Sequence, residues 1–246
     1  MELENCIEYD GKTYYVPTMN TTSSDNWRVI QEFNGSRQIL FDGKLPWLLG
    51  GNDTLINYKI LYKDSLFNID FFFNPTYVEY LRNIPFALSD TSIEFLAPSS
   101  CMTKNISTIN NIIESLPYAE KIDFLLRISQ QIYYKGDLDV YGREVLFIPE
   151  VILYFDIADC EDKSLLFAYL IWHCLHTKTI LLTYPGARHM NVGVESGIID
   201  CNERECINIK GIDYIICEPT SLWYKNGEQM DILNGISANF QWPIFN

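Results

Sequence analysis

The sequence is poor in positive charge. Its 246 residues contain 18 Lys and Arg against 32 Asp and Glu, which gives a formal net charge of −14 at pH 7 and a pI near 4.5. A polyanion of this kind repels the phosphate backbone of nucleic acids and the surface of anionic membranes. We therefore expect no nucleic acid among the partners of this chain.

The sequence also lacks a long apolar segment. A helix needs about 20 consecutive apolar residues to cross a bilayer, and the longest unbroken apolar run, Leu165 to Trp172, is much shorter. The first residues, Met1 to Asn5, have no basic stretch of the kind that opens a signal peptide. We expect no membrane insertion, and a chain that is either cytoplasmic as it stands or an excised segment of a longer exported protein.

Metal-binding patterns are missing as well. The chain has three histidines, and its seven cysteines include no Cys-x-x-Cys pair, so we expect neither a metal site nor a cofactor. Cys201 and Cys206 flank a charged stretch typical of a hairpin tip. They could form a labile cross-strand disulfide, but two reduced thiols are the default expectation. The apolar surroundings of four others predict core positions: Cys6, Cys101, Cys174 and Cys217.

Cys160 differs from the other thiols in its neighbours. It stands between Asp159 and Glu161, just before the run Leu165 to Trp172. A run that is apolar on all sides predicts a buried helix, and Cys160 would lie at its N-terminus, where free amides and the helix dipole favour a thiolate. Asp159 is the expected N-cap, with Asp162 closing a capping box. The alternative is a buried thiol that acts only as a small hydrophobe.

A thiol nucleophile needs a base, and His189 is the candidate. His173 and His176 lie near the far end of the same predicted helix, roughly 20 Å from its start at ~1.5 Å rise per residue. His189 follows a Pro-Gly turn and begins a predicted strand, and Glu218 ends another. Cys160, His189 and Glu218 therefore predict a thiol triad, spaced by 29 residues in each step. A hydrogen-bonded strand histidine and an ordinary acid before a turn are the competing interpretations.

As a set, these motifs resemble the transglutaminase-like branch of the papain-like cysteine enzymes, and most closely the transglutaminase-like proteins common in gut Bacteroidetes. The resemblance spans about Leu116 to Tyr224. It rests on Asp159-Cys160-Glu161-Asp162-Lys163-Ser164, on Tyr184-Pro185-Gly186 before His189, on Glu218-Pro219-Thr220, and on the lead segments Tyr141-Gly142-Arg143-Glu144 and Phe147-Ile148-Pro149-Glu150. The family usually has Asp where this chain has Glu218.

The resemblance implies a papain-like core of helices and antiparallel sheet, and attack of a thiol on a peptide or protein substrate. Hydrolysis of an amide or peptide is the expected outcome. Acyl transfer from protein glutamine, as in a transglutaminase, and a non-catalytic binding or scaffold module are the alternatives.

Chemistry at a carbonyl also requires hydrogen-bond donors for the developing oxyanion. The backbone N–H of Cys160 is the first candidate. Tyr154, six residues upstream, stands at a spacing where papain-like enzymes often place a polar side chain; its competing role is packing within a strand from Val151 to Phe155. Arg188, beside His189, either binds a substrate carboxylate or stays in water.

The composition changes near Leu96 to Asn105 and predicts two domains in an α+β chain. Over residues 1–98, short apolar runs alternate with turn-forming residues, which predicts a β-rich domain. Its expected elements are a hairpin of Ile7 to Tyr9 with Thr13 to Val16, strands at Trp27 to Ile30, Ile56 to Tyr62 and Leu66 to Phe73, and a helix from Thr76 to Asn83. Its many aromatic residues, including Trp27, Trp47 and Phe71 to Phe73, either line a groove or form core.

Residues 99–246 form the second predicted domain, the transglutaminase-like one. Apolar residues three and four apart predict helices before the Cys160 helix, and short alternating runs predict strands after it. The expected helices are Ile106 to Leu116 and Ala119 to Tyr134, and the expected strands are Thr179 to Thr183, Met190 to Val194, Ile207 to Ile209 and Tyr214 to Cys217.

Overall fold

The structure is a computed structural model that describes residues 6–9, 12–15, 53–82, 92–95, 98–141, 145–197, 199–202 and 204–245. The predicted strand from Trp27 to Ile30 and the aromatic residue Trp47 lie outside these ranges. So do three residues of the Tyr141 to Glu144 segment. In the described part of the chain, no helix is both long and apolar enough to cross a membrane.

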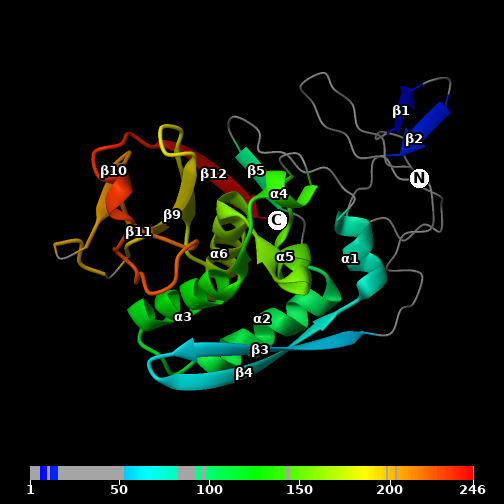
Figure 1. The fold of residues 1–246 in the computed structure, drawn as a ribbon, viewed down its shortest axis with the longest axis horizontal. Coiled ribbons are helices and arrows are strands. Elements are labelled where there is room, and N and C mark those ends of the chain that lie inside the picture. Colours follow the sequence, from blue (N-terminus) through cyan, green and yellow to red (C-terminus); the bar gives the residue numbers. More distant parts are fainter. Residues whose placement is uncertain are drawn as a thin grey trace.

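Helices and strands are mixed along the chain, which confirms the α+β class (Figure 1). The helices are α1 (Pro75–Arg82), α2 (Ser100–Ile113), α3 (Tyr118–Gln131), α4 (Asp137–Tyr141), α5 (Pro149–Phe155) and α6 (Cys160–Leu175), with a 3₁₀ turn at Asp231–Leu233. The strands are β1 (Cys6–Tyr9), β2 (Lys12–Tyr15), β3 (Thr54–Tyr62), β4 (Ser65–Phe73), β5 (Ser92–Phe95), β6 (Tyr133–Tyr134), β7 (Ile157–Ala158), β8 (Thr179–Tyr184), β9 (His189–Glu195), β10 (Cys206–Ile209), β11 (Ile212–Cys217) and β12 (Asn239–Phe245).

A six-stranded sheet in the order β10-β11-β9-β8-β12-β5 forms one side of the molecule (Figure 1). Its pairs are antiparallel except for β12 with β5. The register pairs Tyr184 with His189 across the β8 and β9 turn, and Cys217 with Val192 across β11 and β9. Because β11 ends where β9 begins, the residue after Cys217 arrives at the edge of the sheet that carries His189.

Helix α6 is buried between this sheet and the other helices, as its apolar sequence predicts. Asp159 caps it, because its side chain accepts from the backbone N–H groups of Glu161 and Asp162. The predicted capping box does not form. The Asp162 carboxylate instead accepts from the backbone N–H of Phe147 at 2.8 Å. The helix ends at His176, which adopts a left-handed conformation and donates its N–H to Trp172.

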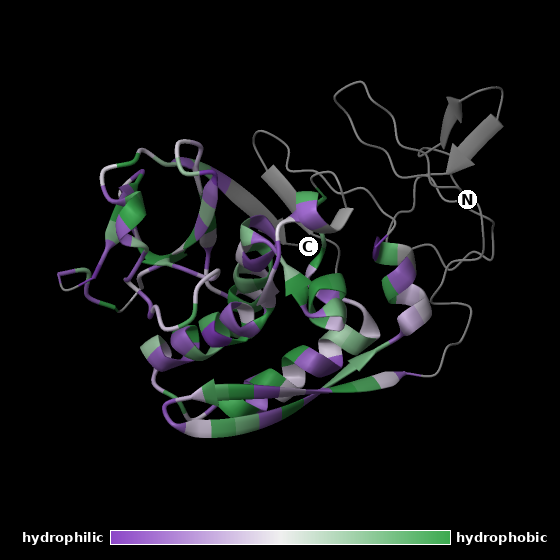
Figure 2. Cartoon of the chain, viewed as in Figure 1, coloured by the Kyte–Doolittle hydropathy of each residue, from purple (hydrophilic) through white to green (hydrophobic). Residues whose placement is uncertain are grey.

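The hairpin of β3 and β4 packs under α2 and α3 (Figure 1). Its residues alternate between hydrophobic and hydrophilic (Figure 2), and the inward set includes the fully buried Phe71 and Phe73. The side-chain amide of Asn105 on α2 bonds both backbone groups of Phe72, at 2.7 Å and 2.9 Å. Phe71 and Phe73 are therefore core rather than groove, whereas Phe72 is half-buried. The hairpin shares one hydrophobic core with α6, and a domain division at residue 98 stays a prediction.

The segment from Val151 to Phe155, expected as a strand, is helical. Pro149 begins α5, and Asp156 ends it in a left-handed conformation. A short apolar run does not by itself distinguish a buried strand from a buried helix. Helix α3 likewise ends earlier than predicted, at Gln131, because Tyr133 and Tyr134 form the short strand β6 beside β7.

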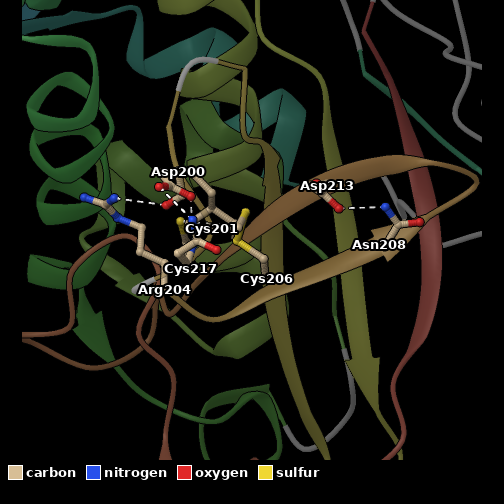
Figure 3. The surroundings of a disulfide bond; sticks show 9 residues. Asp200, Cys201, Arg204, Cys206, Asn208, Asp213 and Cys217 are labelled. Atoms are coloured by element: carbon tan, nitrogen blue, oxygen red, sulfur yellow. Dashed lines mark hydrogen bonds between the residues drawn. A yellow bond between two sulfur atoms is a disulfide. The ribbon is translucent and has the colours of Figure 1, made fainter.

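Cys201 and Cys206 form a disulfide, contrary to the default expectation of reduced thiols (Figure 3). Next to Cys201, the Asp200 carboxylate accepts from the backbone N–H of Asn202 at 3.0 Å. The two cysteine Cα atoms are 5.9 Å apart, a separation that a disulfide spans. Of the thiols predicted in the core, Cys101 and Cys217 are buried and Cys174 is half-buried. Cys6 lies outside the residues whose side chains are described.

Candidate active site

Cys160 is the first residue of α6 and lies against the start of β9. Its Sγ is 4.0 Å from the carbonyl oxygen of Arg188, and the backbone N–H of Met190 interacts with the sulfur. Ser164, one turn along α6, donates its hydroxyl to the carbonyl oxygen of Met190 at 3.0 Å. The thiol therefore contacts the backbone on both sides of His189, and a buried hydrogen bond fixes the helix against that strand.

The environment of Cys160 opposes ionisation of the resting thiol. Burial, followed by the negative charges of Asp159 and Glu161, raises the pKa of Cys160 to about 12. The N–H groups of Met190 and of Cys160 itself lower this pKa, but by less. The amides at the helix N-terminus favour a thiolate, as the sequence predicts, but burial and the two carboxylates outweigh them. At neutral pH the sulfur holds its proton until a base removes it.

His189 and Glu218 form an ion pair or a neutral hydrogen bond at the edge of the sheet, according to the charge of the imidazole. The Nε2 atom of His189 lies 2.9 Å from Oε2 of Glu218. The Glu218 side chain is fully buried, and the His189 side chain is 12% exposed. Because Glu218 occupies Nε2, the ring nitrogen left to exchange a proton with another group is Nδ1.

The Glu218 carboxylate is held by a set of buried donors. Its Oε1 atom accepts from both the backbone N–H and the hydroxyl of Thr220, the first at 3.0 Å. The backbone carbonyl oxygen of Glu218 accepts from Nε2 of Gln130 on α3 at 2.9 Å. A buried charge is tolerated only where such partners satisfy it. The Glu218 side chain is therefore held in a defined site.

Asn191 is the fourth polar residue of this cluster. It lies two positions after His189 in β9, on the same face of the strand, and its side chain is fully buried. In the orientation that satisfies its neighbours, the amide nitrogen lies 2.9 Å from His189 Nε2 and donates to Glu218 Oε2 at 2.7 Å and to the Met190 carbonyl at 3.2 Å. Asp213, an acid on β11, is not among the described partners of His189. Its carboxylate instead accepts from the Asn208 side chain in the exposed β10 and β11 hairpin (Figure 3).

Lys163 is a buried charge that sequence reasoning missed. Its Nζ atom donates to the carbonyl oxygens of Gln130 at 3.2 Å and Thr220 at 3.4 Å, and so joins α3, α6 and the Glu218 turn. Burial lowers the pKa of Lys163 to about 8, although Asp156 and Glu218 oppose the shift. A lysine one turn after the thiol, at the start of an otherwise apolar helix, was the available signal.

Tyr154 and Arg188 are the two remaining residues to which the sequence gives a possible role in the site. Tyr154 lies on α5, where its ring packs edge-on against Phe73 and Phe155, with centroids 5.5 Å and 5.0 Å away. None of its described contacts is with Cys160. Arg188 is exposed and has a positive φ of 50° in the turn before β9. Among the described residues, no group of three or more His, Cys, Asp or Glu side chains is arranged to hold a metal ion.

Comparisons with known proteins add little to this geometry. No protein-family model and no curated protein sequence matches the chain. One solved structure to which part of the chain is similar is LapG of Legionella pneumophila after EGTA treatment, at 12% sequence identity and a TM-score of 0.37. The similarity covers 54% of this chain and 67% of that one. We therefore base the function proposed below on the geometry of the site.

Proposed function

We propose that this protein is a cysteine-dependent amide or peptide hydrolase of the transglutaminase-like type. Cys160 is the nucleophile, His189 the base and Glu218 the group that orients the imidazole. One observation carries the proposal: the buried Glu218 carboxylate binds Nε2 of His189 at 2.9 Å, while the Cys160 sulfur contacts the backbone on both sides of that histidine. A thiol, an imidazole and a buried acid in this order are the parts of a thiol triad.

The raised pKa of Cys160 determines how the first step proceeds. His189 acts as a general base and takes the thiol proton at Nδ1 as the sulfur attacks the substrate carbonyl carbon. The carbonyl π electrons move to oxygen, and the backbone N–H of Cys160 donates to the oxyanion. The Asp159 cap bonds the amides of Glu161 and Asp162, not that of Cys160. Glu218 stabilises the imidazolium that forms.

Collapse of the intermediate completes acyl transfer to the enzyme. The electron pair returns from oxygen, the C–N bond breaks, and the imidazolium gives its proton to the leaving amine. A thioester on Cys160 remains. Water, deprotonated by His189, then attacks the thioester and releases the acid and the thiol. An amine could enter in place of water and give transfer, which uses the same residues; hydrolysis is the default because water is always present.

The test uses p-nitrophenyl acetate as a small acyl donor. We expect a burst of p-nitrophenol with acetylation of Cys160, which peptide mass spectrometry localises, and no burst from Cys160→Ser, because its hydroxyl is far less ionised than a thiol. Added ethanolamine separates the two outcomes: acetate as the main product supports hydrolysis, and N-acetylethanolamine supports transfer. An equal burst from Cys160→Ser would remove the nucleophile, and no burst from either protein would favour a scaffold module.

A further inference from the structure

The mechanism described above leaves the oxyanion with one hydrogen-bond donor, the backbone N–H of Cys160. We propose that the hydroxyl of Tyr134 is the second donor, and therefore a catalytic residue. This inference rests on the proposed function, because it concerns the same carbonyl chemistry. It is carried by the position of Tyr134 beside the nucleophile and by the charged groups around its ring.

The backbone fixes Tyr134 next to the start of α6. Strand β6 pairs in parallel with β7, and the register places Tyr134 opposite Ala158, two residues before Cys160. Two hydrogen bonds hold this pair: Tyr133 N–H to the Asp156 carbonyl at 3.3 Å, and Lys135 N–H to the Ala158 carbonyl at 3.0 Å. The segment that carries Tyr134 is thus anchored to the residues that lead directly into the nucleophile.

The Tyr134 ring lies beside Lys163 of α6. Nζ of Lys163 is 5.8 Å from the ring centroid. Lys163 follows Cys160 by three positions, so the two residues share a face of α6. The same Nζ bonds the carbonyl of Thr220, in the turn that holds Glu218. Lys163 therefore links the Tyr134 ring to the helix start and to the Glu218 turn. Tyr134 is 52% exposed, so that a substrate can reach it.

The hydroxyl keeps its proton in this environment. Partial burial, followed by the charges of Cys160, Asp159, Glu161 and Glu218, raises the pKa of Tyr134 to about 12. Lys163 is the cation next to the ring, and its Nζ is engaged by two backbone carbonyls. A phenol with a raised pKa is neutral at neutral pH, and a neutral O–H can donate to an oxyanion without losing its proton.

The chemical step is simple. When Sγ adds to the carbonyl carbon, the π electron pair moves to the carbonyl oxygen, which then accepts from the Cys160 N–H and from the Tyr134 O–H. No proton leaves Tyr134, and both hydrogen bonds weaken again when the carbonyl re-forms. The contribution is therefore larger in the transition state than in the bound substrate, which is the condition for catalysis.

The experiment compares two reactions of the same sulfur. Acylation by p-nitrophenyl acetate passes through an oxyanion, whereas alkylation by iodoacetamide is a displacement at carbon that forms none. In Tyr134→Phe we expect the Cys160-dependent acylation rate to fall by about tenfold to 10²-fold. We expect the alkylation rate of Cys160 to stay within about twofold of wild type, since hydroxyl removal leaves the thiol and its base in place.

Two matched variants complete the test. Tyr133→Phe removes a hydroxyl from the adjacent residue, which is 65% exposed and points to the opposite side of the strand. Tyr154→Phe removes the hydroxyl of the other candidate donor. Both should acylate as wild type does. An unchanged acylation rate in Tyr134→Phe, or a loss in Tyr154→Phe instead, would overturn the assignment.

An equal fall in acylation and alkylation in Tyr134→Phe would also overturn it, because the hydroxyl would then act on the thiol and not on the oxyanion. The Cys160→Ser control separates this failure from failure of the proposed function. If Cys160→Ser abolishes acylation while Tyr134→Phe does not, the nucleophile stands and only the donor is wrong.

Discussion

Replacing Asp159 by Asn should make the Cys160 thiol more reactive. After burial, the Asp159 carboxylate is the largest cause of the raised pKa of Cys160. Asn caps a helix about as well as Asp, so its side-chain oxygen can still accept from the amides of Glu161 and Asp162. The substitution thus removes a negative charge and keeps the helix start.

The magnitude follows from the electrostatics. Two like unit charges repel by about 4 kcal/mol at about 4 Å and an effective dielectric constant of about 20. With partial screening by solvent we expect the effect here to be roughly one pKa unit, or about 1.4 kcal/mol. A fall of one unit raises the thiolate fraction at neutral pH about tenfold, but the less basic thiolate is about threefold less nucleophilic. The alkylation rate of Cys160 should therefore rise about threefold.

The assay is alkylation by iodoacetamide at neutral pH, followed peptide by peptide with mass spectrometry. Asp213→Asn removes the same charge from an exposed hairpin and should leave the rate unchanged. Asp159→Ala removes the charge together with the cap, and should react faster than wild type while losing about 1 kcal/mol of unfolding free energy. A rate in Asp159→Asn that is equal to or below that of wild type would refute the electrostatic reasoning.

Two further predictions concern buried acids. Glu218→Asp should retain most p-nitrophenyl acetate turnover, whereas Glu218→Gln should lose far more, because an amide cannot stabilise the imidazolium; silence in both would leave Asn191 as the group that orients His189. Glu150 is buried and accepts from the Ser99 hydroxyl at 2.9 Å, and burial raises its pKa from 4.5 to about 7. Above pH 4.5 the unfolded chain releases this proton and the folded chain keeps it, so wild-type stability falls as the pH rises towards 7. Glu150→Gln lacks this loss, so its unfolding free energy should rise relative to that of wild type by up to about 3 kcal/mol between pH 4.5 and pH 7. Urea titrations of both proteins at the two pH values measure this change. A difference between the two proteins that does not change with pH would contradict a raised pKa.

The parts of the site that lie at the ends of secondary structure elements could be predicted from the sequence. The apolar run after Asp159 predicts both α6 and its cap. The strand patterns of β9 and β11 predict that His189 begins one strand and that Glu218 stands at the end of another. Such patterns are local, and antiparallel pairing then brings the two side chains together.

Features that depend on burial could not be predicted in this way. The pKa of Cys160 depends on how deeply the thiol packs under β9, which no spacing reveals. Tyr133 and Tyr134 continue the helical pattern of α3 in sequence, yet pairing with β7 makes them a strand. The distinction between helix and strand at Val151 to Phe155, and the disulfide at Cys201, depend in the same way on tertiary contacts.

Alkylation of Cys160 in His189→Ala tests the central claim most directly, with Cys174 as an internal reference. Both thiols are on α6, and the pKa of each is raised to about 12, but we place His189 beside Cys160 and not beside Cys174. If His189 removes the Cys160 proton, the variant should alkylate at Cys160 about tenfold more slowly or worse at neutral pH, with Cys174 unchanged. Equal rates at Cys160 in the two proteins would mean that the imidazole does not act on this sulfur.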